Sequence, residues 1–138
     1  MIKTFKSFLA EDKREPTTTQ AFEEIVSLFI PFAADALELD DLPNFSLNSE
    51  GSGRSFGSYG GNQINLNVEG RHPMDVLRTL AHEMTHYKQD LHDQLTHESG
   101  ETGSPEENEA NMVAGIIMRD FGRTYPELFS LGPILGEI

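Results

Sequence analysis

The chain has 138 residues, 37% of them hydrophobic, and its 10 basic and 23 acidic residues give a formal charge of −13. This length suits a single domain with its own core. The absence of cysteine excludes disulfide scaffolds, cysteine-ligated zinc, iron–sulfur clusters and thiol nucleophiles. The negative charge argues against nucleic acid or an anionic membrane as a partner, because both are polyanions. We expect a soluble, cytoplasmic protein.

The first 14 residues differ from the rest because they hold four of the ten basic residues. Their apolar residues recur at helical spacing, which predicts a short basic amphipathic helix. The segment is too short and too interrupted for a secretory signal. We therefore divide the chain into residues 1–14, a basic leader or N-terminal helix, and residues 15–138, a single domain.

The segment Phe8-Leu9-Ala10-Glu11 resembles the Leu/Ile-x-Glu site at which the prohead protease of large contractile-tailed phages trims capsid-targeting leaders. This resemblance implies a packaged protein whose mature form begins at Asp12. Its location would then be the host cytoplasm or the virion interior. The alternative is an ordinary N-terminal helix packed on the domain.

The domain opens with a helical pattern. Apolar side chains recur at intervals of three and four residues over 22–39, which predicts an amphipathic core helix. The threonines at 17–19 each suit its N-cap. Pro31 is expected to kink or end this helix, because proline lacks the amide hydrogen and clashes with the preceding turn.

The period changes to two in residues 45–47 and 64–68, where apolar side chains alternate with serine and asparagine. This alternation predicts two strands, which we expect to pair antiparallel. The glycine-rich stretch 51–61 between them lacks the following helix that a phosphate-cradling loop requires. It is predicted to be a flexible hairpin connection.

Two more helices follow. Pro73 suits the first helical position, and an apolar stripe continues to about Leu95. After a polar loop, Ser104-Pro105-Glu106-Glu107 combines an N-cap, a proline at the first helical position and a capping-box glutamate. This pattern predicts a second helix that ends at Gly122.

The segment His82-Glu83-Met84-Thr85-His86 lies in the middle of the helix that begins at Pro73. A spacing of four puts both imidazoles on one face of a helix, where a single tetrahedral Zn²⁺ can bind both nitrogens. Glu83 lies one step round the helix, where it reaches a water held by the metal. The pattern predicts a metal site in preference to two solvated histidines.

A catalytic zinc has three protein ligands and one open position, so the third ligand decides the class of site. His92 has the metzincin spacing, but that arrangement depends on a glycine at the position of Gln89. A continuing helix would carry His92 about 8 to 9 Å along the axis from His86, so we expect it to be a solvated surface residue.

Glu109 is the predicted third ligand. It lies 23 residues after His86, on a helix that can return a carboxylate to the histidines by packing antiparallel through a short loop. Glu106 and Glu107 are nearby acids, but they suit the first turn, where carboxylates complement the helix dipole. Glu109 sits deeper in the helix, beside the small residue Ala110.

Asn108-Glu109-Ala110 resembles the third-ligand segment of gluzincins such as thermolysin. The stretch 107–114, with Met118, is similar to the small ImmA/IrrE-type minigluzincins, which also place a strand before the His-Glu-x-x-His helix. The resemblance spans about residues 64–123. It implies an α+β fold with a minigluzincin-like zincin core, in which a small antiparallel sheet packs against the His-Glu-x-x-His helix and a following glutamate-bearing helix.

One position departs from the thermolysin pattern. That pattern has an aspartate four residues after the ligand glutamate, and the aspartate orients a histidine; this chain has Val113 there. The orienting group must therefore come from another residue, such as Asp90 or Glu106.

We expect a zinc-dependent peptidase in which His82, His86 and Glu109 hold Zn²⁺. Glu83 would act as general base, taking the proton of the zinc-bound water and passing it to the leaving amine. Residues 64–68, as a sheet edge beside the helix, would align an extended peptide or protein substrate by strand addition.

The alternative is a zinc-binding, acidic protein-interaction or regulatory module without proteolytic activity. A chain this small has little room for a second lobe that encloses a substrate, and its acidity suits docking to basic proteins. A purely structural metal, or none, is the third reading. Two histidines and a carboxylate also suit iron or manganese.

Several residues have roles that the sequence does not assign. Three tyrosines are candidate oxyanion donors, and the sequence does not choose between Tyr59, Tyr87 and Tyr125. His72 is expected to be structural. His97, in the polar loop, is within possible reach of the site.

Overall fold

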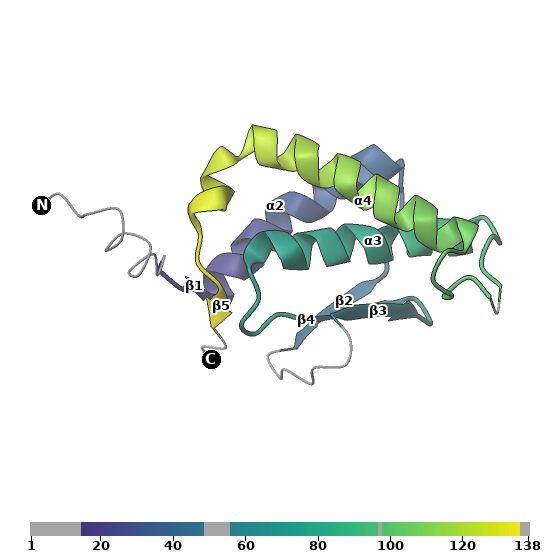
Figure 1. Ribbon diagram of the computed structural model, residues 1–138, viewed down its shortest axis with the longest axis horizontal. Helices are drawn as coiled ribbons and strands as arrows, with labels where there is room; N and C mark the ends of the chain where they lie inside the picture. Colours follow the sequence, from purple (N-terminus) through teal and green to yellow (C-terminus); the bar gives the residue numbers. More distant parts are fainter. Residues whose placement is uncertain (1–14, 49–55, 97, 136–138) are drawn as a thin grey trace, which may run out of the picture.

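The computed structural model describes residues 15–48, 56–96 and 98–135 (Figure 1). In chain order its elements are β1 (Thr17–Thr18), α2 (Thr19–Leu37), β2 (Asn44–Asn48), β3 (Gly57–Gly60), β4 (Gln63–Asn67), α3 (Pro73–Leu91), α4 (Pro105–Thr124), a 3-10 turn (Pro126–Ser130) and β5 (Ile134–Leu135). The fold is thus mixed α/β. No helix among the described residues is long and apolar enough to cross a membrane. The predicted leader, residues 1–14, lies outside the described residues.

Helix α3 is the central element. It lies between the three-stranded sheet and α4, which runs antiparallel to it, and α2 packs on both helices (Figure 1). The contact faces carry small residues, Ala81 on α3 and Ala110 and Ala114 on α4, all at most 1% exposed. Small side chains let two helices approach closely, so the polar residues next to them are brought within contact distance.

The sheet has the order β2-β4-β3. Strands β2 and β4 are the predicted pair, but they run parallel, with Phe45 opposite Ile64 and Leu47 opposite Leu66. The antiparallel prediction was wrong because the connection contains a third strand, β3, which pairs antiparallel with β4. Gly61 and Asn62, at φ 57° and 64°, form the two-residue turn of this hairpin.

The order of the sheet corrects a second expectation. Strand β4, which overlaps the predicted edge 64–68, is the central strand and has neighbours on both sides. Among the described residues the outer strands are β2 and β3, and β3 packs against α3. Any strand addition beside α3 therefore involves β3, which the sequence pattern did not reveal because Gly-Ser-Tyr-Gly has no apolar alternation.

The helix starts follow the sequence more closely than the helix ends. Thr18 and Ser104 cap α2 and α4, their hydroxyl oxygens accepting amide hydrogens at 3.0 and 3.1 Å. Pro31 lies inside α2 and does not end it. Helix α3 ends at Leu91, earlier than predicted, and the chain then turns through Asp93 at φ 55°.

His72 connects the start of α3 to the C-terminal segment. Its Nδ1 accepts the amide hydrogen of Met74 at 3.1 Å, which makes it the N-cap of α3. Its Nε2 therefore carries the proton and donates to the carbonyl oxygen of Leu131 at 2.9 Å. This arrangement accounts for His72 as a structural residue, as expected.

Phe29 should be a main source of stability in the core. It is fully buried and meets Phe121 edge to face, with ring centroids 4.9 Å apart. Phe29→Ala should lower the free energy of unfolding by about 3–5 kcal/mol, because it leaves a cavity. The neighbouring Leu28, 53% exposed, is the matched control, and Leu28→Ala should cost no more than about 0.5 kcal/mol. Similar urea-unfolding curves for the two variants would contradict this core.

Candidate metal centre

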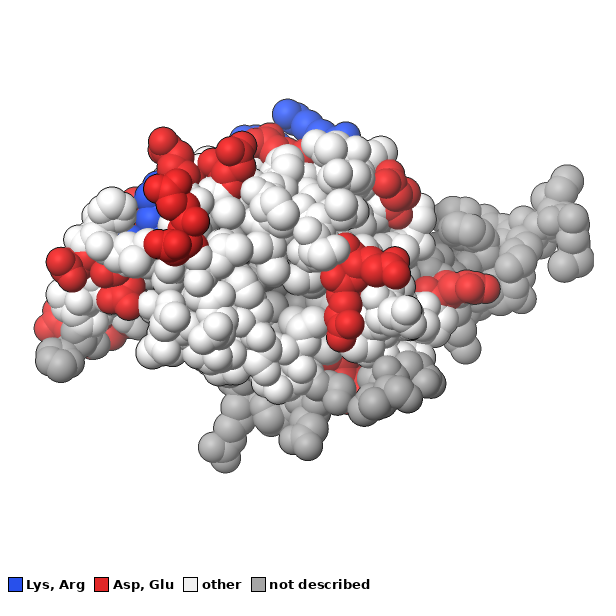
Figure 2. Space-filling model, turned by 180° about the vertical axis from the view of Figure 1, so that it is seen from behind, with Lys and Arg blue, Asp and Glu red and all other residues white. Residues whose placement is uncertain are grey.

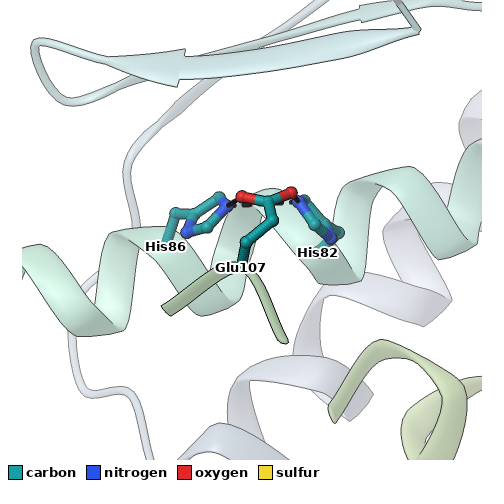
Figure 3. A group of neighbouring side chains, drawn as sticks. All are labelled: His82, His86 and Glu107. Atoms are coloured by element: carbon teal, nitrogen blue, oxygen red, sulfur yellow. Dashed lines mark hydrogen bonds and ion pairs between the residues drawn. The ribbon is translucent and has the colours of Figure 1, made fainter. Parts of the chain in front are cut away.

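Two histidines of α3 and one glutamate of α4 converge on a single point (Figure 3). His82 Nε2 and His86 Nε2 lie 3.1 Å apart. The Glu107 carboxylate sits between the rings, with one oxygen 2.8 Å from His82 Nε2 and the other 3.1 Å from His86 Nε2. One turn of α3 sets the separation of the histidines, and the packing of α4 supplies the carboxylate.

These separations suit a tetrahedral metal ion. Ligand atoms about 2.0–2.1 Å from a tetrahedral zinc lie about 3.3 Å from one another. The 2.8–3.1 Å distances among the three groups are within a few tenths of an ångström of that value. The three side chains are 12–23% exposed, so the point where they meet is largely desolvated but not sealed from solvent. The group can hold a metal ion.

The structure places Glu107, rather than the predicted Glu109, at the histidines. The Glu109 carboxylate lies on another side of α4 and accepts a hydrogen bond from Gln89 at 2.8 Å. The reason is helical periodicity: the buried positions Ala110 and Ala114 continue backwards at intervals of three and four to residue 107. Glu109 is about 200° round the helix from Glu107.

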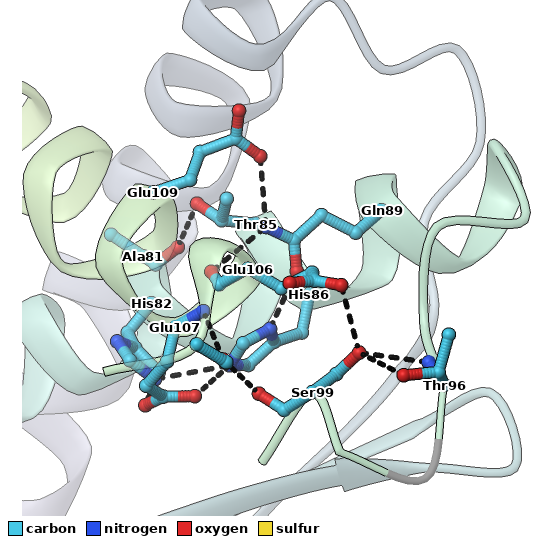
Figure 4. Close-up of polar contacts among 11 residues, drawn as sticks. Ala81, His82, Thr85, His86, Gln89, Thr96, Ser99, Glu106, Glu107 and Glu109 are labelled. Atoms are coloured by element: carbon cyan, nitrogen blue, oxygen red, sulfur yellow. Dashed lines mark hydrogen bonds and ion pairs between the residues drawn. The ribbon is translucent and has the colours of Figure 1, made fainter. Parts of the chain in front are cut away.

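Gln89 orients His86 (Figure 4). Its side chain, in a residue only 1% exposed, donates from Nε2 to Glu109 Oε1 and to the backbone oxygen of Glu106, at 2.8 and 3.0 Å. Because both partners are acceptors, the amide oxygen of Gln89 must be the atom that faces His86 Nδ1 at 2.8 Å. His86 therefore carries its proton on Nδ1, and its Nε2 lone pair faces the shared point.

The state of the His82 ring is set by other neighbours than that of His86. Burial lowers its pKa from the usual 6.5, against the opposing effect of the Glu107 carboxylate, so the ring favours the neutral form that ligates metals. The Asn111 side chain is near enough to this ring to act on its pKa, in the upward direction. Asn111 lies four residues after Glu107, one turn further along the same face of α4.

Glu83 is a buried acid beside this group. It is 8% exposed, and burial is the main reason that its pKa rises from 4.5 to about 7. His86 lowers this pKa and the Glu107 carboxylate raises it, which places Glu83 within electrostatic reach of both. A carboxylate with a pKa near neutrality can both accept and return a proton at physiological pH.

Two hollows flank the metal centre. One, of about 180 Å³, lies beside His86 and is lined by Tyr59, Leu95 and Ser99. The other, of about 400 Å³, is lined by His82 and Glu83 and reaches Phe56 and Arg78. The centre is therefore accessible from both directions along α3.

Of the three candidate oxyanion donors, Tyr59 lines a hollow together with His86. Its hydroxyl donates to Asp90 at 2.6 Å, and burial and this carboxylate raise its pKa well above the usual value. Tyr87 is 5% exposed and packs against the Tyr59 ring. Tyr125 packs on Phe121 in the core.

The remaining sequence candidates lie elsewhere. His92 follows the end of α3 and lines a separate cleft with Lys88 and Glu109, as expected for a residue that is not a ligand. His97 lies outside the described residues. Neither suggested orienting acid reaches a histidine with its carboxylate: Asp90 accepts from Tyr59, and Glu106 accepts from Ser99.

Sequence reasoning missed Gln89, Asn111 and the role of Glu107. The spacing was a signal for Gln89, because it lies three residues after His86 and residues three apart share a face of a helix. For Glu107 the signal was the buried stripe of α4.

In comparisons with family models, curated proteins and solved structures, nothing matches the chain. The possible metal centre therefore stands on its own geometry, a His82-x-x-x-His86 pair with Glu107.

Glu83 should make the metal-free protein less stable as pH rises. The unfolded state loses the Glu83 proton near pH 4.5, whereas the folded state keeps it to about pH 7. The contribution of Glu83 to the free energy of unfolding is therefore greatest below pH 4.5. It falls by about 1–3 kcal/mol as the pH rises from 4.5 to about 7. Urea unfolding with chelator at pH 5.5 and 8 should show this loss in the wild type and a smaller one in Glu83→Gln. Equal pH dependence in the two proteins would contradict the raised pKa.

Proposed function

We propose that the protein is a zinc-dependent peptidase whose metal is held by His82, His86 and Glu107 and whose general base is Glu83. One observation carries this proposal: three acceptor groups converge beside a buried carboxylate that belongs to the same helix as the two histidines. Acceptors held this close repel one another unless a metal ion or a proton lies between them, and the lowered pKa of His82 disfavours the proton. The gluzincin-like order of residues supports the same conclusion.

The donor set favours zinc with an open position. Two imidazole nitrogens and one carboxylate are the protein ligands of a common class of catalytic zinc sites. Iron and manganese accept the same ligands, so the choice of metal rests on measurement. With Glu107 as third ligand, Asn111 occupies the place where the thermolysin pattern has its orienting aspartate.

The side chains of the site would have different tasks in hydrolysis. Zinc, when bound, polarises the scissile carbonyl and makes water a stronger nucleophile. The Glu83 carboxylate takes the proton of the attacking water and delivers it to the leaving amine. Gln89 and Asn111 hold the two imidazoles in orientation. The edge strand β3, packed against α3, aligns an extended substrate by backbone pairing.

Glu107→Ala and Glu109→Ala form a matched pair for the metal assignment. The wild type should bind about one zinc ion per chain. Glu107→Ala should weaken binding by at least about 100-fold, because it removes a ligand, whereas Glu109→Ala should weaken it only about 10-fold through Gln89. Elemental mass spectrometry and competition with a chromophoric chelator measure both. Zinc lost in Glu109→Ala but kept in Glu107→Ala would restore the ligand predicted from sequence.

Glu83→Gln tests the catalytic role. It should keep zinc at the wild-type stoichiometry and lower hydrolysis of a cleaved peptide by about 100- to 10,000-fold, because the base is lost and the shape kept. A digest of a peptide library by zinc-loaded protein, with and without chelator, supplies the substrate. Full activity in the variant with zinc bound would contradict the mechanism. A zinc-loaded wild type that cleaves no peptide would favour the regulatory-module alternative.

A further inference from the structure

The 400 Å³ hollow on the Arg78 side of the histidines has a feature that metal binding and proton transfer do not use. Besides His82 and Glu83, its lining includes the guanidinium-bearing residue Arg78 of α3 and the aromatic residue Phe56. Arg78 precedes His82 by one helical turn, so it stands next to the metal centre on the same side of α3.

Arg78 and the nearby Arg71 differ in how their charges are used. Arg71 donates to the backbone oxygens of Phe56, Asn67 and Asp75 and to the hydroxyl of Thr79, at 2.7–3.2 Å. Arg71 therefore anchors the chain before β3 to α3. Among the described residues, Arg78 is exposed and makes no hydrogen bond or ion pair. Its donors remain available to a ligand.

Helix α4 leaves room for the Arg78 side chain. Gly115 lies beside it, and a Cβ added there would be 3.8 Å from Arg78 Nη1. The guanidinium thus lies over α4 at the rim of the hollow. Arg78 and Glu83 line the same hollow, but no ion pair joins them in the described part of the chain.

The net negative charge of the protein gives Arg78 a particular value for binding a carboxylate. The chain carries −13, and on the face drawn in Figure 2 acidic side chains form several groups while basic side chains show at few points. A carboxylate that approaches this protein is repelled by the net negative charge of the chain. An unpaired guanidinium offsets this repulsion at one place, because it donates two parallel hydrogen bonds to a carboxylate.

The direction of β3 determines which part of a peptide paired antiparallel with it reaches Arg78. Gly57 at the start of β3 lies against Thr79, and Tyr59 further along reaches Asp90, so β3 and α3 run in the same sense. A peptide that pairs antiparallel with β3 runs the opposite way, from the Tyr59 hollow to the Arg78 hollow. Its C-terminal part then lies beside Arg78.

We propose that this hollow is the subsite for a carboxylate in the substrate segment that follows the cleaved bond, and that Arg78 binds it. The carboxylate is either an acidic side chain or the C-terminal carboxyl group. This inference rests on the proposed peptidase function and adds a substrate class to it.

Matched peptides test the subsite in the zinc-loaded protein. One pair carries Glu or Gln after the cleaved bond, and a second pair ends in a free or an amidated carboxyl group. The wild type should favour a carboxylate peptide by about 10-fold or more in kcat/KM, and Arg78→Ala should remove this preference while changing the neutral peptide less than about twofold. Arg78→Lys should restore part of it. Arg119→Ala, an exposed arginine elsewhere on α4, is the control and should change nothing.

The pair that responds identifies the source of the carboxylate. Equal preference in wild type and Arg78→Ala would overturn the subsite, and a preference confined to residues before the cleaved bond would overturn its placement.

A binding measurement tests the subsite separately from the proposed hydrolysis. Calorimetric titration of zinc-loaded Glu83→Gln with the same peptides should show about 10-fold weaker carboxylate binding when Arg78→Ala is added. Unchanged binding would refute the subsite even if no peptide were cleaved.

Discussion

The antiparallel packing of α4 against α3 is the constraint on which the candidate site depends. His82 and His86 are positioned by one turn of α3 alone, but their partner is 21 residues beyond His86, on another helix. Alanines on the contact faces bring the axes close, and the capped first turn of α4 then places the Glu107 carboxylate between the imidazoles. A change that separated the helices would lose the site while leaving the His-Glu-x-x-His segment intact.

The polar residues around the site are arranged so that each buried donor has an acceptor. Gln89 would be costly in a core without partners, yet its amide bonds to Glu109, to the Glu106 carbonyl oxygen and to His86. Two glutamates two residues apart therefore differ in role. Glu107 faces the point that the two histidines share, and Glu109 holds the amide that sets the tautomer of His86. An imidazole with its Nδ1 proton committed in this way presents only one lone pair, and it points at the shared site.

Local sequence signals predicted those parts of the structure that depend on nearby residues. The helix carrying His82 and His86 and the Ser104 cap were confirmed, because spacing and capping act within one turn. The parallel pairing of β2 with β4 was missed, since it depends on where a distant strand returns. Strand β3 was missed because glycine and serine carry no periodic signal. Glu107 was not predicted as a ligand because it lies in the first turn of its helix, where acids complement the dipole. The buried residues of α4, followed backwards at intervals of three and four, lead to position 107.

A metal ion held at this site would link metal binding to folding. Without a cation, the histidine lone pairs face the Glu107 carboxylate beside the buried Glu83 in a largely desolvated place. A metal ion that binds only the folded state stabilises it by an amount that grows with metal concentration. A chelator is therefore expected to lower stability even if the metal is catalytic, so loss of stability alone does not mark a structural metal. Arg78 lines the adjoining hollow and forms no ion pair with Glu83 or Glu107 among the described residues, so the acidic group keeps its attraction for a cation and the proposed subsite keeps its guanidinium.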